Sequence, residues 1–266
     1  MNMQDYPIEK LITLAPRAAI ITGAERGIGR AIALKFAQAG ADLFITGLDQ
    51  ESLDQLQLEI ETRYQRKVVA KVVNLLNAEG AQALVTQAMN HWPHIDIIVN
   101  NAGIFPSLPT LEISDTQWDD LMSINLRSAF IASREFSKRL IAKGCNGTIL
   151  NMLSISGLTS GGNATHYVAS KHALAGVTKS MAVELGPMGI RVIGLAPGLI
   201  LTPGVDQLIG DSADVAASFN DYAQSLPLGR AGTADEVANV ALFAVSELAS
   251  FVTGTIIPVD GGALAL

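Results

Sequence analysis

The sequence predicts a protein of the α/β class, built as one doubly wound parallel sheet. Short aliphatic runs alternate with amphipathic helical stretches along nearly all of its 266 residues. The runs are continuously apolar rather than alternating, which is typical of strands that helices cover on both faces. Apolar residues make up 49% of the chain and aromatic residues only 5%, the aliphatic bias of such a sheet. Because parallel crossovers are right-handed, we expect helices on both faces.

Seven short runs rich in Val, Ile and Leu are predicted to be the strands. In chain order they are Ala18–Thr22, Asp42–Thr46, Val68–Val73, Ile95–Asn100, Thr148–Met152, Arg191–Ala196 and Thr255–Val259. No repeat and no Pro- or Gly-rich linker separates two halves, so a single domain is expected over residues 16–266. Residues 1–15 are expected to form an N-terminal arm, and residues 203–225 a turn-interrupted substrate-binding segment near the carboxyl ends of the strands.

Helical periodicity fills the intervals between these strands. The first predicted helix opens at Gly27, ends at Gly40 and carries five apolar residues on one face: Ile28, Ala31, Ile32, Phe36 and Ala39. Two capping boxes, Ser114/Gln117 and Thr233/Glu236, predict the starts of further helices.

Composition and charge exclude several classes of protein. The net charge is −7, so the chain lacks the basic face that nucleic-acid binding needs; Arg63, Arg66 and Lys67 are interpreted as a solvated helix end. A single cysteine, Cys145, excludes an intramolecular disulfide and a Cys-rich metal site. The acidic N-terminus is not typical of a signal peptide, and no stretch is apolar enough to span a bilayer. We therefore expect a cytoplasmic protein without nucleic-acid or membrane partners.

Three glycines between the first strand and the first long helix have the pattern of a phosphate-binding turn. Gly23 allows a tight turn, Gly27 lets the backbone approach a pyrophosphate, and Gly29 lets the helix pack closely on the strand. The N–H groups and the positive dipole end of the helix would then face the phosphates. This placement at the first βα turn favours a bound ligand over an ordinary strand–turn–helix.

Tyr167 and Lys171 are predicted to form a proton-transfer pair. They lie four residues apart, so a helix would place the ammonium near the phenol oxygen. We expect that charge to draw the pKa of the phenol from about 10 toward about 7, where it can exchange a proton with an alcohol or a carbonyl. Ser154 follows a predicted strand, at the edge where open α/β sheets bind ligands. Asn125 lies within a long helix predicted over Ser114–Lys143, where asparagine is unfavourable.

The TGxxxGxG pattern of Thr22–Gly29, the Tyr167/Lys171 pair and the upstream serine resemble the short-chain dehydrogenase/reductase family. The matches run from about residue 17 to residue 262 and include Asn100–Gly103, Pro197–Gly198 and Val259–Gly262. The resemblance implies a Rossmann-type doubly wound parallel sheet of seven strands. It also implies hydride transfer between a nicotinamide cofactor and a secondary alcohol or ketone. A 3-oxoacyl-reductase-like and a glucose-dehydrogenase-like branch of the family both fit.

The resemblance implies a role for each residue of the expected catalytic set. Tyr167 would be the general acid and base, and Ser154 would hydrogen-bond the substrate oxygen. Lys171 would hold the cofactor ribose and lower the pKa of Tyr167. Asn125 would sit at a helix kink and position a water linked to the lysine. Contacts to the substrate are expected from Ser154, Ser156, Phe105, Asn163 and Tyr167.

The same resemblance implies a cofactor site along the carboxyl edge of the sheet. Asn100–Gly103 would stabilise the sheet and line the adenosine side, whereas Pro197 and Thr202 would contact the nicotinamide and its carboxamide. The full expected set is Gly23, Glu25, Arg26, Gly27, Ile28, Gly29, Gly47, Leu48, Asn74, Leu75, Asn101, Ala102, Gly103, Tyr167, Lys171, Pro197, Gly198, Ile200 and Thr202.

A few positions bear on the choice between NADP(H) and NAD(H). NAD-preferring relatives carry an acid where this chain has Gly47, and NADP-preferring relatives often have an arginine where it has Leu48. Arg26, in the glycine loop, is the basic position typical of NADP-using relatives and suits bidentate binding of a 2′-phosphate. We therefore favour NADP(H) and keep NAD(H) as the alternative. Asp49 is expected to cap the next helix, and Asn74 replaces the acid that usually contacts adenine.

Two other functions are considered: a non-catalytic nucleotide-binding scaffold, and an isomerase or lyase on the same fold. The intact Ser154, Tyr167 and Lys171 favour neither. A homotetramer is expected, formed through the long helix and the helix that bears Tyr167. The four histidines show no metal-ligand spacing, so no metal is expected, and His166 is expected at the pocket rim or surface. Small ketones, sugars or polyols, and 3-oxoacyl groups all fit an apolar pocket as substrates.

Overall fold

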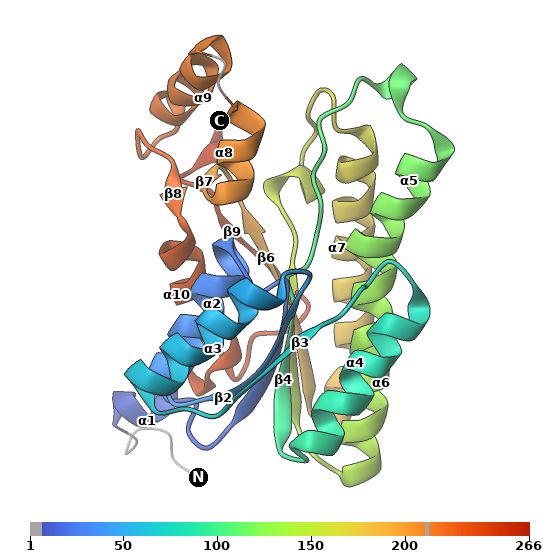
Figure 1. Cartoon of the computed structure of the whole chain (residues 1–266), viewed down its shortest axis with the longest axis vertical. Helices are drawn as coiled ribbons and strands as arrows, with labels where there is room; N and C mark the ends of the chain where they lie inside the picture. The colour runs from blue at the N-terminus through green and yellow to red at the C-terminus, as the bar shows by residue number, and fades with distance from the viewer. Residues whose placement is uncertain (1–6, 211–212) are drawn as a thin grey trace.

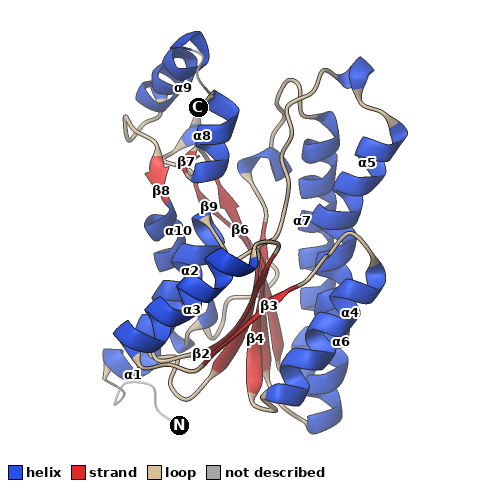
Figure 2. Cartoon of the chain, viewed as in Figure 1, coloured by secondary structure: helices blue, strands red, loops and turns tan. Residues whose placement is uncertain are grey.

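A parallel sheet of seven strands forms the centre of the molecule (Figures 1 and 2). The structure is a computed structural model that describes residues 7–210 and 213–266. The strands are β1 (Ala18–Thr22), β2 (Asp42–Gly47), β3 (Val68–Val72), β4 (Ile95–Asn100), β5 (Gly147–Met152), β6 (Ile190–Pro197) and β9 (Ile256–Val259). Their order is β3-β2-β1-β4-β5-β6-β9, with every pairing parallel. The predicted doubly wound sheet is confirmed, and each strand end lies within one residue of the position expected.

Helices cover both faces of this sheet (Figure 2). One face carries α2 (Gly27–Gln38), α3 (Gln50–Tyr64) and α10 (Ala234–Val245), and the other carries α4 (Ala78–His91), α6 (Ser128–Lys143) and α7 (Thr165–Leu185). The shorter elements are α1 (Ile8–Ile12), α5 (Asp115–Met122), α8 (Pro203–Ile209), α9 (Ala213–Ser225) and the parallel pair β7 (Ile200–Leu201) and β8 (Gly232–Thr233). In the described ranges, no helix is both long enough and apolar enough to cross a bilayer.

The core lies on both faces because successive side chains of a strand point in opposite directions. In β1, Ala19 and Ile21 belong to one cluster with Phe36 of α2, whereas Ile20 belongs to the opposite cluster with Phe136 of α6. All five side chains are fully buried. Burial of each large aliphatic side chain contributes about 1.5–3 kcal/mol. The continuous hydrophobicity of the central strands therefore reflects two buried faces.

The segment ahead of β1 packs against the domain. Leu14 is fully buried, and its N–H donates to the carbonyl oxygen of Ala39 at 2.7 Å. The Thr13 hydroxyl donates to the same carbonyl at 3.2 Å. Residues 7–15 thus cover the end of α2, and residues 1–6 of the expected N-terminal arm lie outside the described residues.

The segment 203–225 forms two helices, α8 and α9, with residues 211–212 outside the described residues. Proline at position 203 suits the first turn of α8 because its φ is already helical and that turn needs no N–H. The Thr202 hydroxyl accepts from the N–H of Val205 at 3.4 Å and caps the helix. The start of α8 is thereby tied to the end of β7.

The long helix predicted over Ser114–Lys143 is divided in the structure. It opens at the expected capping box, in which Ser114 and Gln117 satisfy each other's backbone N–H groups. Residues Ser123–Arg127 then form a π-helical turn between α5 and α6. A π turn adds a residue to the helical repeat and is frequent at functional sites. Asn125 lies within this turn, which explains how an unfavourable helix residue is accommodated.

Candidate active site

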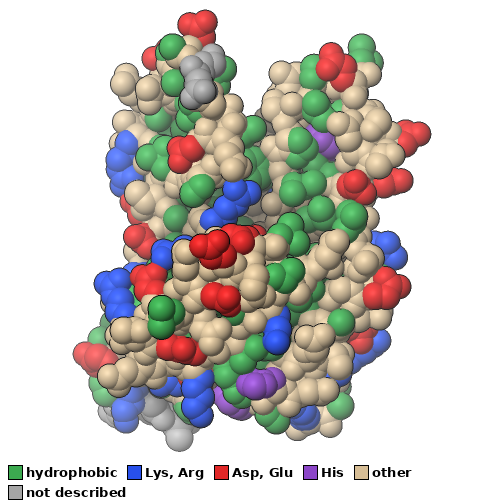
Figure 3. Space-filling view, viewed as in Figure 1, with side chains coloured by type: hydrophobic (Ala, Val, Ile, Leu, Met, Phe, Trp, Pro, Cys, Tyr) green, Lys and Arg blue, Asp and Glu red, His purple; other side chains and the backbone are tan. Residues whose placement is uncertain are grey.

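A cavity of about 360 Å³ opens at the carboxyl ends of the strands. Its walls follow β1 to β6 where these strands end, and α7 and α8 border it. Figure 3 shows the molecule hollowed between the lobe of α8 and α9 and the lobe of α5 and α7, with hydrophobic side chains along the hollow. The strand order reverses between β1 and β4, the place where open α/β sheets bind their ligands.

Nearly all the residues expected at a cofactor site line this cavity. They are Gly23, Glu25, Arg26, Gly27, Ile28, Gly47, Leu48, Asn74, Leu75, Asn101, Ala102, Gly103, Tyr167, Lys171, Pro197, Gly198, Ile200 and Thr202. Gly29 instead lies behind the wall, where an added Cβ would be 2.1 Å from the carbonyl oxygen of Gly23. That close approach matches the packing role expected for Gly29.

The turn after β1 is held against the end of β4. Gly23 has a φ of 62°, and an added Cβ there would lie 3.0 Å from the Cα of Ala102. The Asn101 side-chain amide donates to the carbonyl oxygens of Thr22 and Gly23, both at 2.9 Å. Arg26 precedes α2 without capping it through its side chain. The first N–H groups of α2 therefore remain beside the cavity, as an anion site requires.

Two polar residues at the ends of β2 and β3 behave in different ways. Asp49 caps α3 as expected, accepting from the N–H of Ser52 at 3.4 Å. The Ser52 hydroxyl lowers the pKa of the Asp49 carboxyl below its ordinary value. Asn74 lines the cavity, and its Oδ1 accepts from the N–H of Leu76 at 2.9 Å. The Asn74 amide nitrogen is thus the group left for a ligand.

Tyr167, Lys171 and Ser154 meet where β5 and α7 border the cavity. Lys171 is 4% exposed, and its ammonium donates at 2.8 Å to the carbonyl oxygen of Met152, the last residue of β5. The same ammonium lies 5.6 Å from the centre of the Tyr167 ring. The Ser154 hydroxyl oxygen accepts from the N–H of Ser156 at 3.1 Å, and the same hydroxyl bonds to the Tyr167 phenol, so the two groups face one place in the cavity.

The pKa of Tyr167 shifts in the direction opposite to the one expected. Burial raises it above the ordinary value of 10.0, and the Ser154 hydroxyl only partly opposes that rise. The Lys171 ammonium lies over the ring and bonds to Met152 rather than to the phenol oxygen. Burial also lowers the pKa of Lys171 to about 8, because a buried ammonium loses hydration. The expected lowering is therefore wrong for the free protein, whose phenol keeps its proton at neutral pH.

Asn125 supports the loop after β4 from within the π turn. It is 2% exposed, which excludes a surface amide. Its Oδ1 accepts from the N–H of Ile104 and its Nδ2 donates to the Ile104 carbonyl, both at 2.8 Å, while Ser170 accepts from Nδ2 at 3.3 Å. A Cβ on Gly103 would lie 3.2 Å from Asn125 Oδ1 and 3.6 Å from Lys171 Nζ. The amide and the ammonium thus face the same space, and the water between them stays a prediction.

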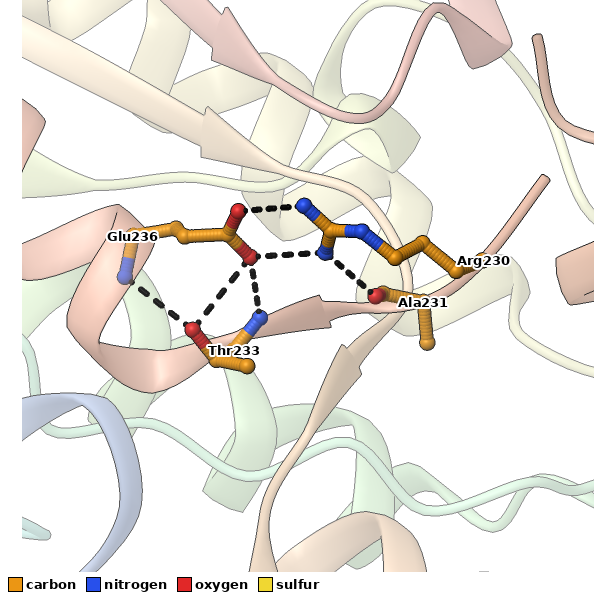
Figure 4. A network of polar contacts seen from close by, with 4 residues as sticks. All are labelled: Arg230, Ala231, Thr233 and Glu236. Atoms are coloured by element: carbon orange, nitrogen blue, oxygen red, sulfur yellow. Dashed lines mark hydrogen bonds and ion pairs between the residues drawn. The ribbon is translucent and has the colours of Figure 1, made fainter. Parts of the chain in front are cut away.

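A polar network beside β8 fixes the loop after β6 (Figure 4). Arg230 donates to Glu236 through both terminal nitrogens, at 3.0 and 2.6 Å. Glu236 also accepts from the N–H of Thr233 at 2.8 Å, which closes the capping box predicted for α10. The Arg230 hydrogen bond holds the pKa of the Glu236 carboxyl down to about 2. Because β8 pairs with β7, this network holds Ile200 at the cavity wall.

Phe105 and the start of α8 border the cavity near Tyr167. The Phe105 ring meets the Tyr167 ring edge-on, with centroids 6.4 Å apart. A Cβ on Gly204 would lie 2.7 Å from the Phe105 ring. Ser156 and Asn163, also expected to contact substrate, are not among the residues that line the cavity. Asn163 is exposed, with a left-handed φ of 54°.

The cavity also contains residues that the sequence patterns did not single out. They include Thr46, Val73, Leu76, Ile124, Met152 and Leu153, whereas Gly204 and Val205 belong to the segment 203–225 expected to bind substrate. Most of them lie at or next to the end of a predicted strand, and this position is the one sequence signal that marks them. Met152 acts through its backbone carbonyl, which no side-chain pattern reveals.

His166 is buried, so the expectation of a pocket-rim or surface residue is wrong. Its exposed fraction is 0%, and neither ring nitrogen has a hydrogen-bond partner among the described residues. His166 shares one face of α7 with the buried Ser170 and Leu174, at intervals of four residues. Turning away from Tyr167 therefore directs the ring into the protein rather than to solvent. Burial lowers the pKa of His166 below its ordinary value of 6.5.

Comparison with known proteins gives matches over nearly the whole chain. The family model described as enoyl-(acyl carrier protein) reductase matches residues 23–263. The 3-oxoacyl-[acyl-carrier-protein] reductase of Aquifex aeolicus is 38% identical over 251 residues, which cover 94% of this chain and 98% of that protein. The gluconate 5-dehydrogenase of Gluconobacter oxydans is 34% identical over 253 residues, covering 95% and 96%.

A solved structure is similar throughout its length. It is that of a proposed NAD(P)-dependent gluconate 5-dehydrogenase from Beutenbergia cavernae, which holds NADP at low occupancy. Its TM-score is 0.89 at 35% identity, covering 96% of this chain and 100% of that one. Gly23–Gly29, the Tyr167 helix and the loop after β6 all fall within residues 23–263, which the family model matches.

Replacing His166 by leucine should weaken the acid sensitivity of the fold. The lowered pKa means that the folded state favours the neutral ring, so this contribution to stability is complete above about pH 6.5 and is lost as the pH falls. Urea unfolding between about pH 7 and about pH 5 should show a smaller loss for His166→Leu, the difference being at most about 1.4 kcal/mol per pH unit. If the free energy of unfolding falls equally with pH in wild type and in His166→Leu, the buried histidine is not the source of the acid sensitivity.

Proposed function

We propose, because this chain belongs to the short-chain dehydrogenase/reductase family, that it interconverts a secondary alcohol and a ketone by hydride transfer with NAD(P)(H). The family membership makes it an oxidoreductase acting on CH–OH groups. One observation carries the proposed site: a single cavity joins the glycine-lined turn after β1 to Tyr167, Ser154 and Lys171.

The chain's own residues fit a dinucleotide. At one end, Gly23 and Gly29 leave no room for a Cβ, and the start of α2 offers N–H groups to a pyrophosphate. Pro197, Gly198 and Thr202 also line the cavity, and the Thr202 side chain lies 3.5 Å from where a Cβ on Gly27 would be. These residues would hold the phosphates and the nicotinamide, respectively, as the family resemblance implies.

In the reducing direction, Tyr167 donates the proton. Its raised pKa keeps the phenol protonated at neutral pH, as a general acid requires. The Ser154 hydroxyl donates to the same substrate oxygen and stabilises the negative charge that develops there. When bound, the nicotinamide ring supplies the hydride to the carbonyl carbon, or accepts it in the oxidising direction. In that direction the phenolate of Tyr167 takes the hydroxyl proton.

Lys171 supplies the positive charge for this exchange. Its buried ammonium lies 5.6 Å from the Tyr167 ring centre, so it stabilises the phenolate left when the proton departs. One N–H bond is committed to the Met152 carbonyl, and the other two remain for the cofactor ribose. Its pKa of about 8 keeps the charge in place at neutral pH.

The choice between the two nucleotides rests on a few residues at the end of β2 and in the glycine loop. Arg26 and the missing acid at Gly47 favour NADP(H), and the Beutenbergia cavernae relative holds NADP. The carboxylate of Glu25 also lies at the end of β2, and a carboxylate there favours NAD(H). We therefore propose either nucleotide as the cofactor.

The substrate end suits an uncharged carbonyl compound. Phe105, Leu199 and Val205 make this part of the wall apolar. Among the described residues that line the cavity, the cations are Arg26 in the glycine loop and Lys171 beside the tyrosine. Oxidation of NADH and NADPH with a panel of small ketones, keto sugars and 3-oxoacyl thioesters tests the reaction class. If none of these compounds causes nucleotide oxidation while the nucleotides bind tightly, the non-catalytic scaffold is favoured instead.

Replacing Tyr167 by phenylalanine should lower turnover roughly 100- to 10,000-fold, because the proton donor is lost. Nucleotide affinity should stay within about twofold of wild type, since the hydroxyl acts on the substrate. Steady-state kinetics and nucleotide titration check the two effects separately, with Tyr64→Phe on α3 as the matched control. Turnover above a few per cent of wild type would remove Tyr167 from its role.

Nucleotide binding should weaken as the pH rises above about 8. Lys171 then loses its proton, and with it the charge that holds the cofactor ribose. The dissociation constant of NADH, measured between about pH 7 and about pH 9.5, should rise by up to about tenfold per unit above the pKa. The Lys171→Met variant should bind NADH weakly, and its dissociation constant should not rise with pH in this range. If the dissociation constant rises with pH in both proteins, the titrating group is not Lys171.

The protein is proposed to assemble as a homotetramer through α5, α6 and α7. Val183 on α7 and Ile141 on α6 are large apolar residues exposed at 78% and 41%. Val183→Glu should lower the sedimentation coefficient, whereas Leu58→Glu on α3, a residue 65% exposed, should leave it unchanged. A wild-type monomer at micromolar concentration would overturn this assembly. The cytoplasmic location expected from the sequence stays a prediction.

A further inference from the structure

We infer that Glu25 sets the nucleotide preference by taking the place of the acid that Gly47 lacks. Its carboxylate would accept a hydrogen bond from the ribose 2′-hydroxyl of NAD(H) and repel the 2′-phosphate of NADP(H). The inference rests on the proposed function, because it concerns the same dinucleotide site. It reverses the preference that the sequence favours, and the geometry at the end of β2 gives the reason.

The Glu25 side chain occupies the space that a side chain at position 47 would fill. A Cβ built on Gly47 would lie 2.2 Å from Glu25 Oε2, 2.5 Å from its Cδ and 3.0 Å from its Oε1. Gly47 is a strand residue without a left-handed φ, so its backbone conformation does not demand glycine. Glycine is needed at position 47 for a steric reason, because any side chain there would collide with the Glu25 carboxylate.

Glu25 is held in this position through one oxygen only. Its Oε1 accepts from the N–H of Leu48 at 3.2 Å, which ties the glycine loop to the residue after β2. Its Oε2 is buried and has no hydrogen-bond partner among the described residues. A buried acceptor without a donor is rare. Glu25 itself lines the cavity, so a rotation of its carboxylate toward a bound ligand hydroxyl would supply the missing donor.

The end of β2 is where a dinucleotide's adenosine ribose is recognised. In doubly wound sheets the phosphates bind at the first βα turn, and an acid at the end of the second strand accepts from the ribose 2′-hydroxyl. Here the acid comes from the turn itself and reaches the end of β2 over Gly47. The recognition group is therefore present although the usual position lacks it.

The charges around this place disfavour a 2′-phosphate. In the described part of the chain Glu25 forms no ion pair, and Leu48 is the apolar residue beside it. Arg26 instead donates to Gln207 of α8 at 3.1 Å, so its guanidinium is engaged by the opposite wall. A doubly charged phosphate beside the Glu25 carboxylate would meet repulsion, which the Arg26 guanidinium, directed at Gln207, offsets only in part.

The test is the affinity of NADH and NADPH for the protein without substrate, measured by nucleotide fluorescence. Wild type should bind NADH more tightly. Glu25→Gln keeps the shape and the acceptor for Leu48 but removes the charge. It should therefore lower the preference for NADH roughly 10- to 150-fold, mainly through tighter binding of NADPH. Competition by ADP and by 2′,5′-ADP should change in the same proportion, which locates the effect at the ribose.

A second variant moves the carboxylate without touching Glu25. Gly47→Ala places a Cβ on the Glu25 carboxyl group and should shift the preference in the same direction. The double variant Glu25→Ser/Gly47→Asp puts an acid at the usual position and should restore the preference for NADH. Glu51→Gln, on the exposed first turn of α3, changes the net charge equally and should leave the ratio unchanged.

The outcomes separate this inference from the proposed function. A wild type that binds neither nucleotide overturns both. Binding of both nucleotides with a wild-type preference for NADPH, or with a ratio that Glu25→Gln leaves unchanged, overturns the role of Glu25 alone. A shift in the ratio that Glu51→Gln reproduces also overturns it, because general charge would then be the cause.

Discussion

The close approach of the turn after β1 to the end of β4 is the constraint on which the site depends. Asn101 holds the two segments together by donating to the carbonyl oxygens of Thr22 and Gly23, both at 2.9 Å. The approach is possible because Gly23 and Gly29 have no side chain to separate them. The strand order reverses at this place, so the chain leaves β1 and β4 toward opposite faces and a crevice opens between them.

The catalytic end is built on the same edge by a buried charge. Lys171 loses hydration inside the protein, and the Met152 carbonyl of β5 compensates one of its N–H bonds. Gly157 lets the turn that follows Ser154 pack on α7, since a Cβ there would lie 2.8 Å from the Lys171 carbonyl oxygen. The turn that carries Ser154 is therefore packed directly on the stretch of α7 that carries Tyr167 and Lys171.

The strands and most cavity residues follow from local patterns, because aliphatic runs and glycine spacing act over a few residues. Properties that depend on packing do not. The pKa of Tyr167 rises because the fold buries it, which the Tyr167/Lys171 spacing does not reveal. His166 is buried because its face of α7 turns inward. The contact of Glu25 with Gly47 joins residues twenty-two positions apart. The inferred role of Glu25 in nucleotide preference depends on this contact, which neither residue alone indicates.

In the function proposed here, one cavity holds a nicotinamide dinucleotide from the glycine turn to Tyr167, with the adenosine ribose beside Glu25. A crystal structure of the protein with NADH would test this arrangement. We expect the pyrophosphate at the start of α2, the ribose 2′-hydroxyl within hydrogen-bond distance of the Glu25 carboxylate, and the nicotinamide facing Tyr167. A dinucleotide bound away from the glycine turn, or bound there with its nicotinamide remote from Tyr167, would contradict it.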